Sequence, residues 1–359
     1  MSSSPYASPL GRIKAQLPSF LPKDTYATLA NAPDVGEIAK SLEPTPYGPY
    51  LGQAAATYRG ADLIEVAVNR YFVQRNRMGL DVAPFAGRPI VQAYLRRWDI
   101  QNVGAILAAK VQGRALTEEE TFLVSPRELP AGLLAGPMVL DDFRLLMQAP
   151  NVEAVVQGLV KFGYGAVLLP LVENFQRTKD IFPLLSALDR YYYAQLLEAT
   201  RFFQGDEWTV RRFIQTEIDV RNVLLLLKGR DASFAPEVVF PRFLEGGDWG
   251  KAAAQDLYST ARDVPDLVQA LETRAPRLVD GLERYRTDRS LVGFEAALTR
   301  QRAIDQLKQL RSYPLSLSVI FAFLLLAELE RNDLQRIVYA KAYGVPRDQF
   351  EPLLVSPSL

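Results

Sequence analysis

Three stretches of the chain carry the same pattern: DIQNVGAILAAKVQG at residues 99–113, DVRNVLLLLKG at 219–229 and ERNDLQRIVYAKAYG at 330–344. Each begins with an acidic residue, has Asn or Asp three positions later, and ends on a glycine that follows a lysine. The opening acids lie 120 and 111 residues apart, and the middle copy reaches its glycine four residues sooner than the other two. A unit of this size that recurs along one chain predicts three related modules.

Apolar residues recur at helical spacing through most of the chain. In the first copy Val103, Ile106 and the aliphatic stem of Lys110 lie on one helical stripe, which Asp99 and Asn102 share. A second helical segment precedes each copy, at residues 61–72, 187–193 and 292–298. The sequence therefore predicts an all-α fold in which each module pairs one helix with a longer one.

The glycine that closes each copy stands where its helix is expected to end. Glycine is the residue that most readily takes the left-handed conformation of a helix C-cap. We therefore expect C-caps at Gly113, Gly229 and Gly344. Clusters of proline and glycine at residues 125–132 and 240–247 mark the joins between modules. The predicted modules are residues 1–130 with the N-terminal helices, residues 131–245 and residues 246–359.

Composition excludes several classes of function. The 359 residues include 41 Lys and Arg and 41 Asp and Glu, so no net charge favours nucleic acid. The absence of cysteine and histidine excludes thiolate nucleophiles, cysteine zinc sites and histidine general bases. The longest apolar run, residues 315–327, is too short to span a bilayer, and the N-terminus lacks the features of a signal peptide. We expect a soluble, cytoplasmic protein without direct bilayer insertion.

Motifs for cofactor chemistry are also missing. Gly250-Lys251 is followed by Ala252 rather than the Ser or Thr of a phosphate-binding loop. The pair Asp141-Asp142 lacks the third aspartate and the second motif of magnesium-dependent prenyl-transfer enzymes. Acidic residues are favourable in the first turn of a helix, so we interpret this pair as a solvated helix N-terminus. No catalytic residue, cofactor or metal is predicted.

The repeated acids allow two interpretations. In one, the carboxylates of Asp99, Asp219 and Glu330 face a shared axis and act there. In the other, which we favour, each is buried and hydrogen-bonded to a neighbouring helix, because buried polar groups are almost always paired. The residues assigned to helix packing on this basis are Asp99, Asn102, Lys110, Gly113, Asp219, Asn222, Gly229, Glu330, Asp333, Lys341 and Gly344.

Arginines supply the candidates for partner contact. Four of them stand in pairs shortly before the acid of the first two copies: Arg96, Arg97, Arg211 and Arg212. Arg75 and Arg77 form another small cluster. Such groups usually belong to a solvated face, and contact with a protein partner is the alternative.

The pattern Y-L-x-x-x-D-x-x-N-V-x-x-I-L-x-x-K-x-x-G at Tyr94 to Gly113 resembles the C subunits of the rotary A-type and V-type ATP synthases and ATPases, the counterparts of the eukaryotic V-ATPase d subunit. The N-terminal residues are similar to the same family, with an aromatic start at Tyr6, an Arg12-Ile13 helix and a segment that ends in Thr45-Pro-Tyr47. The third copy resembles the C-terminal helix of the family. The resemblance spans nearly the whole chain.

This resemblance implies a funnel-shaped protein of three helical modules with pseudo-threefold symmetry. It implies a non-catalytic adaptor of the central stalk, peripheral on the cytoplasmic face of the membrane, with the D and F subunits of the central shaft and the membrane proteolipid ring as partners. Two differences show that the three modules are not strictly equivalent in sequence: the middle copy is shorter, and the third copy begins with Glu330 where the other two begin with aspartate. A helical-repeat scaffold for another protein is the alternative from a different class, and a metal-dependent helical enzyme is a third.

Overall fold

The chain is all-α in the part that the structure, a computed structural model, describes: residues 5–113, 138, 140–201, 207–274, 285–287 and 289–356. Every regular element in these residues is an α-helix or a short 3-10 helix, and none is a strand. The predicted fold class is thus confirmed. The predicted join at residues 125–132 lies outside the described residues.

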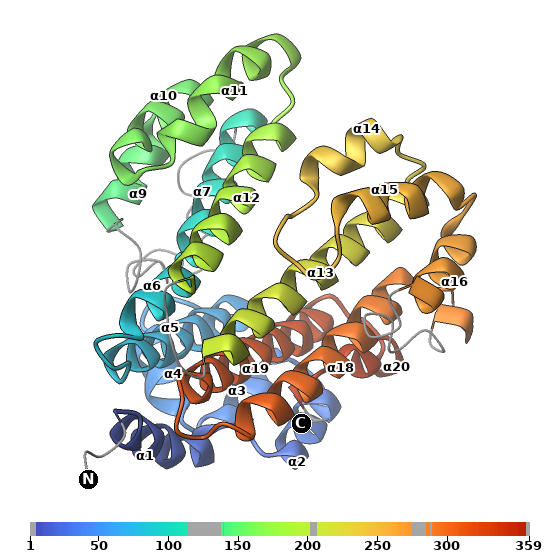
Figure 1. Cartoon of the computed structure of the whole chain (residues 1–359). Coiled ribbons are helices and arrows are strands. Elements are labelled where there is room, and N and C mark those ends of the chain that lie inside the picture. Colours follow the sequence, from blue (N-terminus) through green and yellow to red (C-terminus); the bar gives the residue numbers. More distant parts are fainter. Residues whose placement is uncertain are drawn as a thin grey trace. The chain divides into compact units, whose positions relative to one another are not determined.

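The helices form two compact units (Figure 1). The first unit comprises Met1–Gly87 and Asp280–Leu359, and the second comprises Arg88–Val279. The first contains α1 (Ala7–Gln16), η1 (Leu17–Ser19), α2 (Lys23–Asn31), α3 (Val35–Leu42), α4 (Gly48–Ala54), α5 (Gly60–Asp81), α18 (Leu291–Arg311), α19 (Ser318–Ala342), α20 (Arg347–Phe350) and η7 (Glu351–Leu353). The second contains α6 (Arg88–Leu95), α7 (Arg97–Gln112), α9 (Leu140–Gln148), α10 (Val152–Gly158), η4 (Val160–Phe162), α11 (Gly165–Thr178), α12 (Phe182–Ala199), α13 (Glu207–Asp231), α14 (Pro236–Val239), η5 (Phe240–Arg242), α15 (Lys251–Thr260) and α16 (Val264–Arg274).

All three repeated stretches lie on long helices. The first is on α7 and the second on α13, both in the second unit, and the third is on α19 in the first unit. A grouping into two units does not test the three-module division, so the boundaries near residues 130 and 245 and the pseudo-threefold symmetry stay predictions.

Helices α5 and α19 form the centre of the first unit and lie side by side in Figure 1. The stripe of α5 that begins at Ile64 and Ala67 is buried at helical spacing, and it packs with Leu334 and Ile337 of α19. Helices α2, α3 and α4 add their apolar faces to the same core. The N-terminal residues and the C-terminal helix therefore share one hydrophobic core, although more than 250 residues separate them in sequence.

The three repeated glycines do not share one conformation. Gly113 and Gly344 take the left-handed conformation, with φ of 65° and 67°, immediately after α7 and near the end of α19. Gly229 lies inside α13, which continues to Asp231, so the prediction of a C-cap there is wrong. A Cβ at Gly229 would lie 2.8 Å from a methyl group of Val239, which shows that this glycine allows a close approach of α14.

Candidate functional site: the repeated carboxylates

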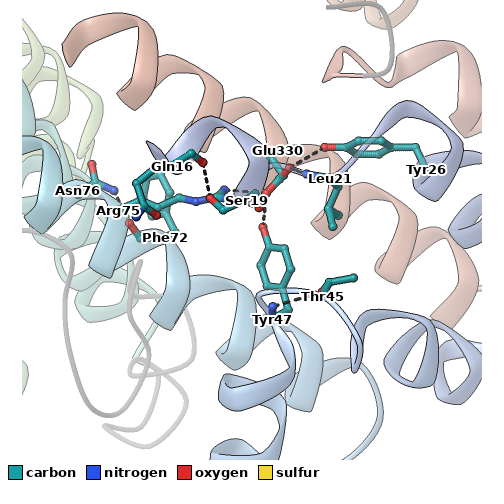
Figure 2. Close-up of polar contacts among 10 residues, drawn as sticks. All are labelled: Gln16, Ser19, Leu21, Tyr26, Thr45, Tyr47, Phe72, Arg75, Asn76 and Glu330. Atoms are coloured by element: carbon teal, nitrogen blue, oxygen red, sulfur yellow. Dashed lines mark hydrogen bonds and ion pairs between the residues drawn. The ribbon is translucent and has the colours of Figure 1, made fainter. Parts of the chain in front are cut away.

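The third carboxylate, Glu330 on α19, is the centre of a buried polar cluster. Figure 2 shows the groups that converge on it from segments distant in sequence. Its Oε2 accepts hydrogen bonds from the backbone N–H of Leu21 (2.7 Å) and the hydroxyl of Tyr26 (3.2 Å). Its Oε1 accepts from the hydroxyl of Tyr47 (2.7 Å) and from the guanidinium of Arg75 (2.6 Å). With four donors on its two oxygens, this carboxylate has little capacity left for another ligand.

Arg75 on α5 is the cation that neutralises Glu330. Its side chain is 4% exposed and that of Glu330 is 2% exposed. The guanidinium also donates to the carbonyl of Ser19 (2.9 Å) and lies 4.0 Å and 4.1 Å from the ring centroids of Phe20 and Tyr71. A buried ion pair is tolerated only when such extra contacts satisfy its remaining polar atoms. The prediction of a solvated cluster at Arg75 and Arg77 is therefore wrong for Arg75, because α5 turns it towards α19.

The tyrosines of this cluster are held in their neutral form. Burial raises the pKa of the Tyr47 hydroxyl well above its usual value, and the negative charge of Glu330 raises it further. The same two causes, in the same order, raise the pKa of Tyr26. Both hydroxyls therefore act as permanent donors to Glu330.

The second carboxylate, Asp219 on α13, accepts hydrogen bonds from backbone groups instead of from side chains. Its oxygens accept hydrogen bonds from the N–H groups of Asp248 (3.0 Å) and Trp249 (3.1 Å). Burial raises the pKa of Asp219, and these two N–H groups oppose the shift. Three residues on, the Asn222 amide exchanges two hydrogen bonds with the backbone of Leu244, at 2.8 Å and 2.9 Å.

The same kind of contact occurs on α19. Asp333, which follows Glu330 by three residues, accepts from the N–H groups of Val355 (2.9 Å) and Ser356 (2.6 Å). Asn222 to Leu244 and Asp333 to Val355 are both steps of 22 residues. In the second and third copies, the polar side chain three positions after the acid thus hydrogen-bonds to the backbone of the segment that follows the long helix.

The first carboxylate, Asp99 on α7, differs from the other two. It is fully buried, and among the described residues neither of its oxygens has a hydrogen-bond partner. Burial raises the pKa of Asp99 to about 8, with Arg96 opposing the shift. Asn102 is also fully buried and takes part in an interaction within the chain.

The lysines of the two outer copies occupy different environments. The ammonium of Lys110 donates to the carbonyl of Met147 at the end of α9. That of Lys341 lies 5.6 Å from the ring centroid of Phe350. Whether the repeated residues serve chiefly in helix packing is not tested by these contacts, so this role stays a prediction.

The four candidate contact arginines are also in different surroundings. Arg97 is largely buried, pairs with Glu217 on α13 at 3.2 Å, and donates to the hydroxyl of Tyr94 at 2.7 Å. Arg212 pairs with Asp248 at the surface. Arg211 lies 3.4 Å from the hydroxyl of Thr200, and Arg96 lies beside Asp99.

Two groups of the polar interior were not predicted from the sequence. Glu217 accepts a hydrogen bond from the hydroxyl of Tyr193 at 2.6 Å and pairs with Arg97. The second unit thus has a largely buried ion pair of its own, besides the Arg75–Glu330 pair of the first unit. Tyr47 ends the Thr45-Pro-Tyr47 segment of the sequence, and its hydroxyl reaches Glu330. Neither belongs to the repeated pattern, and only the helix packing brings them to their partners.

The acidic pair of α9 lies at the start of a helix, as predicted. Asp141 and Asp142 are both in its first turn. Asp141 pairs with Arg144 at 3.1 Å and Asp142 with Lys161 at 2.8 Å. Among the described residues, no three acidic side chains come together in a way that could hold a metal ion.

Fold and site together define an all-α protein built on a recurring helix, with buried polar groups that join segments distant in sequence. None of the helices in the described ranges is long and apolar enough to cross a membrane.

Comparison with known proteins identifies the family. Residues 9–352 match the model of the ATP synthase (C/AC39) subunit family, and the chain belongs to this family. It is 33% identical to the A-type ATP synthase C subunit of Thermoplasma volcanium, over 98% of both chains. It is 32% identical to that of Thermoplasma acidophilum, over 98% of this chain and 99% of the relative. The C subunit of the Methanocaldococcus jannaschii A-type ATP synthase is 26% identical over 98% of this chain and 87% of its own.

Proposed function

We propose that this protein is the C subunit of an A-type ATP synthase and acts as a non-catalytic adaptor of its central stalk. In this role it couples the rotating shaft to the membrane proteolipid ring, through which protons or sodium ions move. The observation that carries the proposal is the match over residues 9–352, together with relatives named as the C subunits of A-type ATP synthases that align over 98% of the chain.

The physical character of the chain supports a mechanical role. A coupling element must resist deformation, and close-packed helices resist it because their interiors are as dense as organic crystals. The cluster around Glu330 adds charged and neutral hydrogen bonds that join α19 to α5 and to the N-terminal residues. A load on either terminal segment is therefore shared by the same core.

The proposed partners are the D and F subunits of the shaft and the proteolipid ring, with the protein peripheral on the cytoplasmic face. Arg211 and Arg212 on α13, together with Arg96, are the candidates for partner contact. Arg97 is a weaker candidate because its charge is already used by Glu217.

Co-purification tests this assignment. A tagged chain is expressed with the remaining proteins of the complex, the membranes are solubilised, and the tag should retain the shaft and the ring. A chain that folds but is recovered without them would refute the proposal and would favour a scaffold for another protein.

Crosslinking would then locate the contacts. Because the chain contains no cysteine, a single introduced cysteine is the only thiol of this chain to which a crosslinking reagent can be attached. We expect Arg212→Cys to crosslink to the shaft or the ring in the assembled complex, and Lys40→Cys on the exposed face of α3 serves as a matched control.

A further inference from the structure

A pair of short helices recurs three times in the fold, at nearly the same spacing as the repeated carboxylates. The pairs are α2–α3, α9–α10 and α15–α16. In each pair the second helix follows an N-cap residue whose side-chain oxygen accepts a hydrogen bond from the backbone N–H three residues on: Asp34 from Glu37 (2.9 Å), Asn151 from Ala154 (2.9 Å) and Asp263 from Asp266 (2.8 Å). These caps lie 117 and 112 residues apart, close to the 120 and 111 residues that separate the carboxylates.

The buried positions of the three pairs also agree. Valine follows each cap residue, and the fourth and eighth residues after the cap are apolar and fully buried: Ile38 and Leu42, Val155 and Leu159, Leu267 and Leu271. In the first helix of each pair, a buried leucine lies five or six residues before the cap and is followed by a second buried residue: Leu29 and Ala30, Leu146 and Met147, Leu257 and Tyr258. Helix pairs that share a cap and a buried face can pack in the same way against a longer helix.

In the second unit each pair follows a long helix of the repeat in the chain and packs against it. The pair α9–α10 contacts α7, and α15–α16 contacts α13 through α16. The basic residue eleven positions after the repeated acid donates to a backbone carbonyl in the first helix of the pair: Lys110 to Met147, and Arg230 to Tyr258. Met147 and Tyr258 are equivalent positions of the two pairs, so both pairs are attached to their long helices in the same register.

The third long helix receives its pair from the other end of the chain. In the described residues α19 is followed only by α20 and η7, whereas the N-terminal pair α2–α3 packs on it. Leu29, Ile38 and Leu42 of this pair share one core with Leu334 and Ile337 of α19. The three buried positions that mark the other pairs are therefore used here against α19.

The repeated acid fixes the start of the pair in the same way in the second and third copies. Asp219 accepts from the backbone N–H of Trp249 (3.1 Å), two residues before α15 begins. Glu330 accepts from the backbone N–H of Leu21 (2.7 Å), two residues before α2 begins. The N-terminal segment thus enters its helix pair at the carboxylate, as the segment after α13 does.

The length of the preceding segment gives the same register. Leu244, which Asn222 binds, lies five residues before Trp249, and Val355 is bound by Asp333 at the equivalent place. The fifth residue counted from Val355 would therefore come where Leu21 lies beside Glu330.

We propose that residues 21–42 are the closing helix pair of the third module, carried at the opposite end of the chain, and that contacts with α19 hold them in place of a covalent link. The division from sequence groups these residues with the first module, whereas their repeat equivalents are α9–α10 and α15–α16. This inference does not depend on the proposed function, because it concerns the folding of the isolated chain.

Transposition of the segment tests the proposal with every residue retained. Residues 21–42 are cut out, Phe20 is joined to Glu43 by a flexible Gly/Ser linker, and the segment is attached directly after Leu359. Four residues then separate Val355 from Leu21, as four separate Leu244 from Trp249. The transposed chain should fold with a melting temperature within about 5 °C of wild type, because each contact of the segment with α19 can form again. The same chain without the returned segment is the control and should be far less stable.

Two substitutions report whether the transposed segment is docked. Leu29 is fully buried, so Leu29→Ala should lower the melting temperature by roughly 5 °C or more, and by the same amount in the wild-type and transposed chains. Thr28→Ala, at an exposed position of the same helix, should leave both nearly unchanged. A transposed chain that is insensitive to Leu29→Ala would overturn the proposal, since its segment would not lie on α19.

A second rearrangement covers a transposed chain that fails to fold. This chain begins at Glu43 and carries residues 1–42 after Leu359 through a long Gly/Ser linker, so the segment can dock without the direct connection. If it folds and the transposed chain does not, the segment does not continue the third module in register, and the proposal is refuted. If neither folds, the segment requires its covalent link to α4, which equally refutes the proposal.

Discussion

Replacement of Glu330 by glutamine should destabilise the first unit strongly. The change keeps the size of the side chain but removes the negative charge that faces the Arg75 guanidinium at 2.6 Å. Arg75 is 4% exposed and has no other charged partner within salt-bridge distance among the residues described, so it would be left buried and uncompensated. Removal of one member of a buried ion pair typically costs about 3–5 kcal/mol.

Hydrogen bonding adds to this loss. The carboxylate accepts two donors on each oxygen, whereas glutamine has one carbonyl oxygen and presents N–H₂ to the other two donors. We therefore expect a loss in the upper half of that range. For a cooperative unit of about 150–250 residues it lowers the melting temperature by roughly 10 °C or more.

The assay is urea and thermal unfolding followed by far-UV circular dichroism, which reports the helices. Glu37→Gln is the control, because Glu37 pairs with Lys40 at the surface and such pairs contribute less than about 1 kcal/mol. Arg75→Met and the double variant Arg75→Met with Glu330→Gln complete a cycle whose coupling energy should exceed about 1 kcal/mol. Equal stability of Glu330→Gln and wild type, or strict additivity in the cycle, would refute the reasoning.

Substitutions at three other repeated positions distinguish the roles of those residues. Asp219→Asn should lose about 1–3 kcal/mol because it leaves a backbone N–H of the Trp249 loop without an acceptor, and Trp249 fluorescence should shift during native-state titration with urea. Gly344→Ala should cost about 1 kcal/mol through strain at φ 67°, since nothing lies within 4 Å of the added Cβ, and Gly344→Asn should cost less in the same unfolding assay. Gly229→Ala acts through contact instead, because its Cβ would lie 2.8 Å from a methyl group of Val239 and 3.3 Å from the hydroxyl of Tyr258. The drop in melting temperature that it causes should therefore be smaller in a Val239→Ala background than in the wild-type chain, and an equal drop in both backgrounds would contradict this explanation.

The helix pattern could be predicted because it depends on local spacing. Apolar residues at three- and four-residue intervals identify the buried face of α7 and of the other two repeated helices. Gly113 and Gly344 mark the ends of their helices because glycine readily adopts the left-handed backbone conformation found there. Gly229 shows where this reasoning fails. A glycine at a helix end and a glycine inside a helix against a neighbour look alike in sequence, and only the approach of Val239 separates them.

The recurring sequence pattern was therefore enough, without knowledge of any tertiary contact, to determine the helical class, the positions of the three repeated helices and the family. The partners of each carboxylate were decided by tertiary structure. Arg75 reaches Glu330 from 255 residues away, and Asp99 at the equivalent position receives no comparable donor from the described residues. A repeat specifies which side chain points inward, whereas its charge state depends on the groups that other segments bring to it, because burial and nearby charge together set the free energy of ionisation.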